Sequence, residues 1–331
     1  RAPPRPAPHP SPAPSPPPPT RRAPRPGPGR ETTGPPRPAP PEAATRPRKS
    51  PTPLLLRLVR LGFATLGRLF PRRAAQIAVR LFSTPRKRAR HQASDALLER
   101  AEIFEFLYAD QLLKGYQWGT GERTVLLVHG WESRGTALRS FVPGLLAEGF
   151  RVVAFDGPAH GNSGGKETNL PHFGGAIRAI IHRLGGVYGI IAHSFGGAST
   201  VFALSKLDPS IQIDRLVMVA SPSDIRRGLR DFLDLIQAPK AVDKAFWRLL
   251  QRKFSLNIEE VKVSQLYDQV QVDRLLLLHD EADEVVPFAE SQDIVRHWPN
   301  SRLLSTSGQG HYRLMKRTEV VECIVDFISE K

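Results

Sequence analysis

From about residue 100 onward, short uninterrupted apolar runs alternate with stretches that suit helices. Such runs are typical of strands buried on both faces, as in parallel sheets. The alternation predicts an α/β fold with a mostly parallel central sheet and helices on both faces. Segments 103–108 and 112–118 are expected to form an antiparallel start to this sheet. The predicted buried strands are 124–128, 152–155, 187–191, 215–220, 274–278 and 302–305.

A long stretch, 223–269, separates two of these predicted strands, and it is too long for a plain connection. Ser223 and Asp224 suit a helix N-cap, apolar residues then recur at helical spacing, and a second such run covers 241–254. We therefore expect a helical cap over the carboxyl edge of the sheet. Three apolar cap residues are candidates to line an acyl or alkyl pocket, with packing of the cap as the alternative: Phe232, Trp247 and Phe254.

The N-terminal part of the chain differs in composition. Residues 1–53 hold 22 of the 32 prolines and almost no large apolar side chain, which predicts a disordered Pro/Arg-rich tail with polyproline-II character. A tether for an SH3-like partner or an anionic surface is the functional alternative. The predicted organisation is therefore this tail, a basic amphipathic helical segment at 54–98, and one α/β domain at 99–331.

The segment at 54–98 allows two interpretations. Its first apolar run is interrupted by Arg57, Arg60 and Arg68, so it is too short and too charged to span a bilayer. A second run, 74–82, precedes a basic cluster at 86–90. We favour helices that pack on the α/β domain at 99–331 with their arginines outward. The alternative is weak peripheral contact of residues 54–90 with anionic lipid.

Charge and composition exclude several function classes. The net charge is +15, but residues 1–94 hold 20 Lys/Arg and 2 acids, whereas residues 95–331 hold 27 and 30. Because residues 95–331 are nearly neutral, we do not expect a nucleic-acid partner. Cys323 is the single cysteine, so no intrachain disulfide forms. Because no Cys/His cluster has zinc spacing and no glycine-rich loop ends in G-K-[ST], we expect neither a metal nor a cofactor.

The sequence A-H-S-F-G-G at 192–197 lies between a predicted strand and a predicted helix. A serine at such a junction is typical of a nucleophile elbow, whose tight turn requires small residues two positions before and after it. Ala192 and Gly196 meet that requirement. Ser194 is therefore the candidate nucleophile, and a capping serine in an ordinary turn is the alternative.

Four further motifs follow the ends of predicted strands: H-G-W at 129–131, D-G-P-A-H-G-N-S at 156–163, H-D-E-A-D-E-V-V-P at 279–287 and G-Q-G-H at 308–311. Together with the elbow they resemble the α/β-hydrolase superfamily over roughly residues 100–331. The chain is most similar to the serine aminopeptidase/esterase-like bacterial hydrolases with a helical lid. The resemblance implies the α/β-hydrolase fold and a cofactor-independent triad.

The resemblance also assigns roles to individual residues. Ser194 is the implied nucleophile, His311 the general base, and the backbone N–H groups of Phe195 and Trp131 the oxyanion donors. Asp283 matches the family's D-x-x-V-P position and is the implied acid.

Other residues near these motifs are weaker candidates. Asp224, which follows the strand at 215–220, is the second candidate acid, and Asp280 and Glu281 are off register. His129 and His160 are expected in structural or pocket-lining roles, His193 in packing, and His279 at the sheet edge. Asp156 is expected to bind loop backbone.

The predicted function is serine hydrolysis of a carboxylic ester with a small to medium apolar substrate, through an acyl-enzyme. Amide or peptide hydrolysis, acyl transfer or perhydrolysis on the same triad, and non-catalytic ligand binding are the alternatives. The expected partner is a small-molecule ester or amide, the oligomeric state is left open, and the expected location is the cytoplasm, with weak membrane contact as the alternative.

Overall fold

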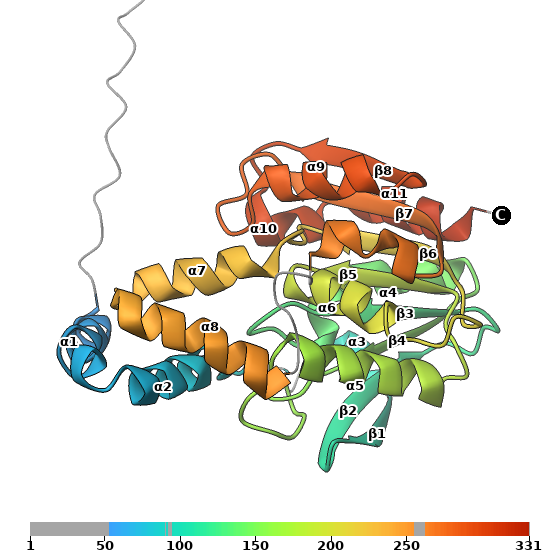
Figure 1. Cartoon of the computed structure of the whole chain (residues 1–331). Helices are drawn as coiled ribbons and strands as arrows, with labels where there is room; N and C mark the ends of the chain where they lie inside the picture. The colour runs from blue at the N-terminus through green and yellow to red at the C-terminus, as the bar shows by residue number, and fades with distance from the viewer. Residues whose placement is uncertain (1–52, 90, 92–94, 255–261, 331) are drawn as a thin grey trace, which may run out of the picture. The chain divides into compact units, whose positions relative to one another are not determined.

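The computed structural model describes residues 53–89, 91, 95–254 and 262–330 (Figure 1). Nearly all of the predicted disordered tail, and the side chain of Phe254, lie outside the described residues. In the described part of the chain, no helix is long and apolar enough to cross a membrane.

Eight strands in this part of the chain form one sheet, in the order β1-β2-β4-β3-β5-β6-β7-β8. The β1–β2 and β2–β4 pairs are antiparallel, and the remaining pairs are parallel. This confirms the predicted α/β-hydrolase fold, including its antiparallel start. The strands are β1 (Glu102–Tyr108), β2 (Gln111–Trp118), β3 (Thr124–Val128), β4 (Arg151–Phe155), β5 (Gly189–His193), β6 (Ile213–Val219), β7 (Val272–Asp280) and β8 (Ser301–Thr306).

The helices largely follow the predicted periodicity. The α-helices are α1 (Leu54–Leu69), α2 (Pro71–Ser83), α3 (Ala96–Glu99), α4 (Val142–Ala147), α5 (Leu170–Arg183), α6 (Phe195–Leu204), α7 (Ile225–Leu235), α8 (Lys240–Phe254), α9 (Phe288–His297), α10 (Gly310–Arg313) and α11 (Thr318–Ser329). Short 3₁₀ segments are η1 (Gly135–Phe141), η3 (Val263–Gln265), η4 (Tyr267–Gln269) and η5 (Leu314–Lys316).

The segment after β8 is not one continuous helix. The chain turns at Arg317, whose φ/ψ of −75°/130° is extended, and α11 begins after it. Just before the turn, the Ser140 hydroxyl donates to the carbonyl oxygen of Met315 at 2.6 Å. This bond holds η5 against η1 and separates α10, which carries His311, from α11.

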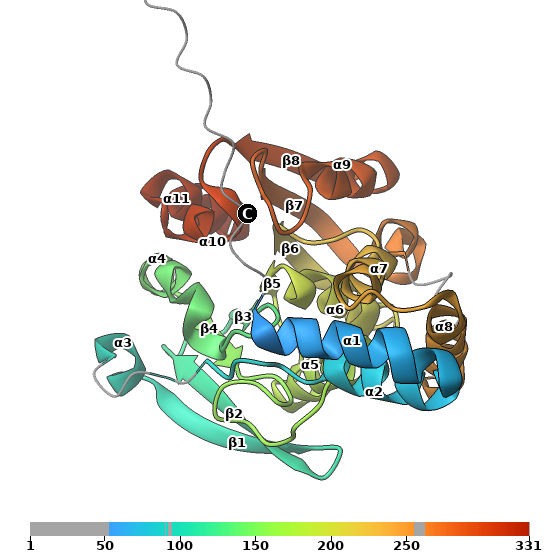
Figure 2. The same cartoon turned by 90° about the vertical axis from the view of Figure 1, so that its left-hand side faces the viewer.

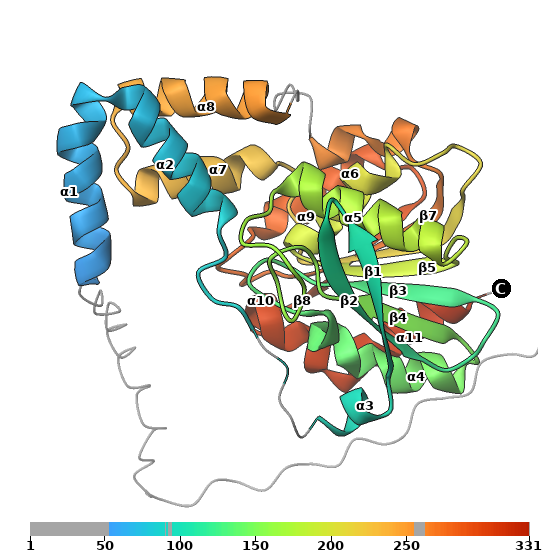
Figure 3. The same ribbon diagram turned by 90° about the horizontal axis from the view of Figure 1, so that it is seen from below.

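Alternate residues of each central strand enter two separate hydrophobic clusters on the two faces of the sheet. Leu126 and Ile190 pack with residues of α5, α6 and α9, whereas Leu127 and Ile191 pack with residues of η1, α4 and α11 (Figure 3). These central strands are therefore buried on both faces, which explains their uninterrupted apolar sequences.

A third hydrophobic cluster joins α1 and α2 to the two helices that follow β6, and we call α1, α2, α7 and α8 the four-helix cluster (Figures 1 and 2). The Asp224 carboxylate caps α7 by accepting the backbone N–H of Arg226 at 2.9 Å, as the sequence predicts. Phe63 on α1 and Val79 on α2 are buried against Leu233 and Phe246. The N-terminal helices thus pack mainly on the helices inserted after β6 rather than on the sheet layers.

Candidate active site

Ser194 lies in the turn between β5 and α6, where its backbone takes φ 54° and ψ −125°. This left-handed φ costs a non-glycine residue about 1–3 kcal/mol, which surrounding contacts must offset. One such contact is the bond from the Ser194 N–H to the carbonyl oxygen of Val219, at 2.8 Å. The turn therefore holds the serine side chain at the carboxyl edge of the sheet, as expected of an elbow.

The small residues of the elbow are required by close backbone approach. A Cβ at Gly196 would lie 2.4 Å from the carbonyl oxygen of His129, and one at Gly197 would lie 2.0 Å from the hydroxyl of Ser221. Ala192 is fully buried in β5. Its methyl group is accommodated there, so alanine satisfies the first small position of the motif.

The structure brings the three predicted catalytic residues together. His311 Nε2 lies 2.9 Å from Ser194 Oγ, and His311 Nδ1 lies 2.7 Å from Asp283 Oδ2. Asp283 follows β7 and His311 lies in α10, after β8. His311 and Asp283 are buried, while Ser194 is half-buried. Both distances suit hydrogen bonds, and the ring can bridge the hydroxyl and the carboxylate.

Asp283 is held as an anion by its surroundings. Burial alone would raise the pKa of Asp283, but hydrogen bonds from His279 and His311 and from two backbone N–H groups hold that pKa well below its usual range. Those N–H groups belong to Val285 and Val286 and donate to Oδ1 at 2.8 and 2.9 Å. The carboxylate can therefore stabilise a positive charge on His311.

The other candidate acids make different contacts. Asp224 forms an ion pair with Arg226. Asp280 is buried and accepts bonds from the Thr306 hydroxyl and the Gln309 N–H, so it fixes the loop before His311. Glu281 is exposed. Among these candidates only Asp283 is hydrogen-bonded to the His311 ring.

Two buried histidines hold the loop that carries Trp131. His129 donates from Nδ1 to the carbonyl oxygen of Gly130 at 2.7 Å, and its Nε2 accepts the N–H of Gly157 at 2.9 Å. His160 Nε2 accepts the N–H of Glu132 at 3.0 Å. Burial lowers the pKa of both rings, that of His160 to about 3, so both are neutral and each Nε2 can accept a hydrogen bond. The expected structural roles of these histidines are confirmed.

Asp156 ties the same loop region to the sheet. Its buried carboxylate accepts the N–H groups of Gly135 and Asn162 and the hydroxyl of Tyr116, at 2.7–2.8 Å. These contacts confirm the expected loop-binding role. His91 Nε2 also lies 3.1 Å from Asp156, a contact from the N-terminal segment that no sequence motif indicates.

Aromatic rings lead from the elbow to the four-helix cluster. Phe195 and Trp131 meet edge to face at 5.3 Å between ring centroids, Trp131 stacks with Phe82 at 6.4 Å, and Phe82 meets Phe232 at 5.3 Å. Phe82 was not among the predicted site residues. Its only signal in the sequence is its place at the end of an amphipathic run.

The three predicted pocket residues differ in where the structure places them. Phe232 lies in this chain of rings, while Trp247 packs edge to face on Phe246 within the four-helix cluster. Phe254 cannot be placed because its side chain lies outside the described residues. The loop residue Trp131 and the elbow residue Phe195 thus border the same aromatic surface as Phe232.

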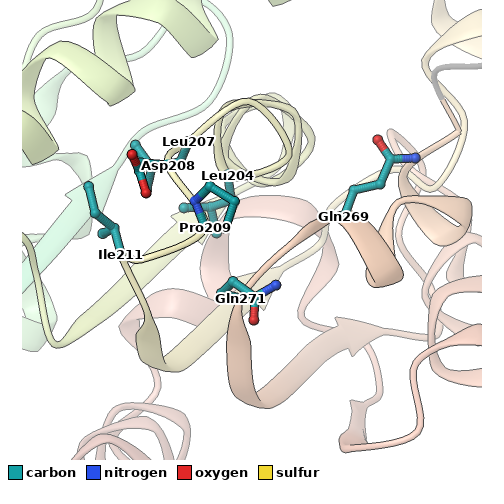
Figure 4. Close-up of a pocket in the computed structure, with 7 residues that line it drawn as sticks. All are labelled: Leu204, Leu207, Asp208, Pro209, Ile211, Gln269 and Gln271. Atoms are coloured by element: carbon teal, nitrogen blue, oxygen red, sulfur yellow. The ribbon is translucent and has the colours of Figure 1, made fainter.

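Figure 4 shows a small hollow lined by Leu204, Ile211 and Gln271, among others. It lies near the amino-terminal ends of β6 and β7, whereas Ser194 and Asp283 follow the carboxyl ends of their strands. The hollow is therefore separate from the candidate site. Across the described residues, no group of three or more His, Cys, Asp or Glu side chains is arranged to hold a metal ion.

The fold and this site define the class of protein. The model of the alpha/beta hydrolase family matches residues 125–322, more than half of the chain, and the chain belongs to that family. It is a hydrolase by this membership. No match is found among curated proteins.

Several solved structures share the fold. An esterase of Pyrococcus furiosus is 21% identical, covers 74% of this chain and 96% of its own, and has a TM-score of 0.56. An esterase from Exiguobacterium antarcticum is 19% identical, with 66% and 96% covered and a TM-score of 0.53. Est1E from Butyrivibrio proteoclasticus, solved with ferulic acid, is 18% identical, with 69% and 100% covered and a TM-score of 0.54.

Proposed function

We propose that this hydrolase is a serine esterase that cleaves carboxylic esters with small to medium apolar acyl groups. The observation that carries the proposal is the continuous hydrogen-bonded path from Ser194 Oγ through the His311 ring to Asp283. The strained turn at Ser194 and the anionic Asp283 suit nucleophilic attack. Esterases among the structures of similar fold are consistent with it.

In the proposed reaction Ser194 Oγ attacks the ester carbonyl carbon while its proton passes to His311 Nε2. The oxyanion accepts bonds from the N–H groups of Phe195 and Trp131, neither of which donates to another group in the described part of the chain. His311 then returns the proton to the departing alcohol oxygen, leaving an acyl-Ser194. Water, deprotonated by His311, attacks this ester, and His311 returns that proton to Ser194 Oγ as the carboxylic acid is released.

The aromatic surface supports an apolar acyl or alkyl group. Phe195, Trp131, Phe82 and Phe232 lie in sequence from the elbow to the four-helix cluster. Aromatic rings supply large apolar contact area at little cost in conformational entropy. We infer that the four-helix cluster acts as the lid over this part of the site.

A fluorophosphonate probe tests the proposal, because it labels only an activated serine. Labelling is expected in the wild-type chain and lost in Ser194→Ala. The matched control is Ser199→Ala, which removes a buried hydroxyl in the following helix and should still be labelled. p-Nitrophenyl esters from C2 to C12 then measure acyl preference. A folded wild-type chain that is neither labelled nor active on these esters would contradict the proposal and favour a non-catalytic binding protein.

A further inference from the structure

Helix α1 has two apolar faces, and the residues that the structure describes cover only one of them. Phe63 and Gly67 are buried in the four-helix cluster. On the opposite side six leucines, each 57–74% exposed, fall on one helical face: Leu54, Leu55, Leu58, Leu61, Leu66 and Leu69. Phe70, just after this helix, is also 56% exposed. Soluble proteins rarely leave so many large apolar side chains together in water, so this leucine face indicates a docking surface.

The chain segment that carries the leucine face has only positive charges. Residues 43–94 contain no acidic side chain. Arg57 and Arg68 follow one edge of the leucine face at helical spacing, and Arg72 and Arg73 begin the next helix. These four arginines form no ion pair with any residue that the structure describes. Their charges are therefore free to meet an anionic partner.

We propose that the leucine face of α1 docks on an anionic lipid surface, with the helix lying in the plane of the interface. Apolar residues on one side and arginines along the edge are the pattern of interfacial helices. Arginine heads at the headgroup level pair with anionic lipids while the leucines enter the acyl boundary. Residues 1–52, which precede α1 in the chain, add ten Lys/Arg and only two acids.

The same charges argue against two other occupants. A second copy would bring two sets of unpaired arginines together with no acidic residue on either helix. The segment 1–52 is itself cationic and nearly without large apolar side chains, so it cannot complement a leucine face. In position, α1 lies at the outer edge of the four-helix cluster, away from the sheet, where a flat surface can reach it (Figures 2 and 3).

Vesicle co-sedimentation with the full-length chain tests this proposal. We expect binding to phosphatidylcholine vesicles that contain phosphatidylglycerol, weaker binding in high salt, and little binding to phosphatidylcholine alone. The double variant Leu58→Glu/Leu61→Glu should lower the partition coefficient at least about tenfold, because two leucines that would enter the acyl boundary are lost. The control Leu107→Glu/Leu112→Glu makes the same change at two exposed leucines of the β1–β2 pair and should bind like the wild type.

A second variant separates charge from apolar contact. Arg57→Gln/Arg68→Gln/Arg72→Gln/Arg73→Gln is expected to weaken binding to anionic vesicles several-fold. Equal binding by the wild type and Leu58→Glu/Leu61→Glu would overturn the proposal, even if the basic tail holds the chain on vesicles. A wild-type dimer in sedimentation velocity that the leucine variant abolishes would also overturn it, in favour of a second copy. Esterase activity is measured beside each variant, so a failure of the lipid proposal is distinguishable from a failure of the proposed function.

Discussion

The ring of His193, directly before the elbow serine, donates a hydrogen bond from Nε2 to the backbone carbonyl oxygen of His311 at 3.0 Å. The two rings are also in contact, with centroids 4.7 Å apart. His193 is buried, and burial lowers its pKa to about 3, so the ring is neutral. The residue beside the proposed nucleophile therefore fixes the backbone of the proposed base.

Replacing His193 tests this positioning role. In His193→Ala we expect kcat on a p-nitrophenyl ester to fall about 10–100-fold with little change in KM, because the His311 ring loses its alignment with Ser194. His193→Gln keeps a donor and should recover part of kcat. A folded His193→Ala variant with wild-type kcat would contradict the role.

Asp283 and Asp224 give the sharpest comparison of the two candidate acids. Asp283→Asn should lower kcat about 10⁴-fold, because an amide can no longer hold the productive His311 tautomer and stabilise its charge. Asp224→Asn should leave kcat within about twofold, since its carboxylate binds Arg226 and caps α7. Steady-state kinetics decide the matter, and the reverse ranking would assign the acid to Asp224.

Glycine at position 196 is predicted to be indispensable for folding. Gly196→Ala would force a Cβ to 2.4 Å from the His129 carbonyl oxygen, and we expect it to lower the free energy of unfolding by about 3 kcal/mol or more. Gly228→Ala, in α7 with no atom within 4 Å, should raise that free energy by about 0.5–1 kcal/mol. Urea denaturation measures both, and equal effects would contradict the close approach.

Much of the fold and most of the site could be predicted because the signals are local. Strands buried on both faces have uninterrupted apolar sequences, and Ser194, Asp283 and His311 each follow a strand in a recognisable motif. The contact between His193 and His311 joins residues 118 positions apart and leaves no local pattern. The meeting of Phe82 with Trp131 likewise depends on how α2 packs against α7.

The N-terminal helices show why burial was harder to predict. α1 is apolar on two sides, and periodicity alone does not say whether Phe63 or Leu58 faces the protein. We expected the arginines outward. Arg57 and Arg68 are exposed, and the leucine face is exposed with them, whereas Arg60 is half-buried and its Nε donates to the carbonyl oxygen of Leu235 at 2.9 Å. Which face of α1 is buried depends on contacts with α7 and α8, which are about 170 residues away in sequence.

Phe82, which lies on α2 outside the sheet, is predicted to influence which acyl chain lengths the enzyme prefers. Phe82→Ala removes the ring between Trp131 and Phe232, so we expect kcat/KM to fall about tenfold for C6–C8 p-nitrophenyl esters and less for C2. Phe70→Ala, a phenylalanine exposed just before α2, is the control and should keep the wild-type profile. A uniform loss at all chain lengths would instead indicate a structural role for Phe82.

The buried neutral histidines predict how stability depends on pH. Burial lowers the pKa of His160 and His193 to about 3, whereas in the unfolded chain each titrates near 6.5. Below pH 6.5 the unfolded state therefore binds protons that the native state does not, and stability falls as the pH decreases. Each ring should contribute about 1.4 kcal/mol per pH unit to this slope between pH 6 and pH 4.

Urea denaturation at half-unit steps from pH 7.5 to 4.5 measures that slope. His160→Asn and His193→Gln should each reduce the slope by about 1.4 kcal/mol per pH unit, whatever their effect on stability at pH 7.5. The low pKa of Asp283 has the same sign, because its anion is favoured in the native state, but its contribution is lost only as the pH falls below about 4. A slope between pH 6 and 5 that neither substitution changes would mean that these rings gain protons in the native state as readily as in the unfolded chain.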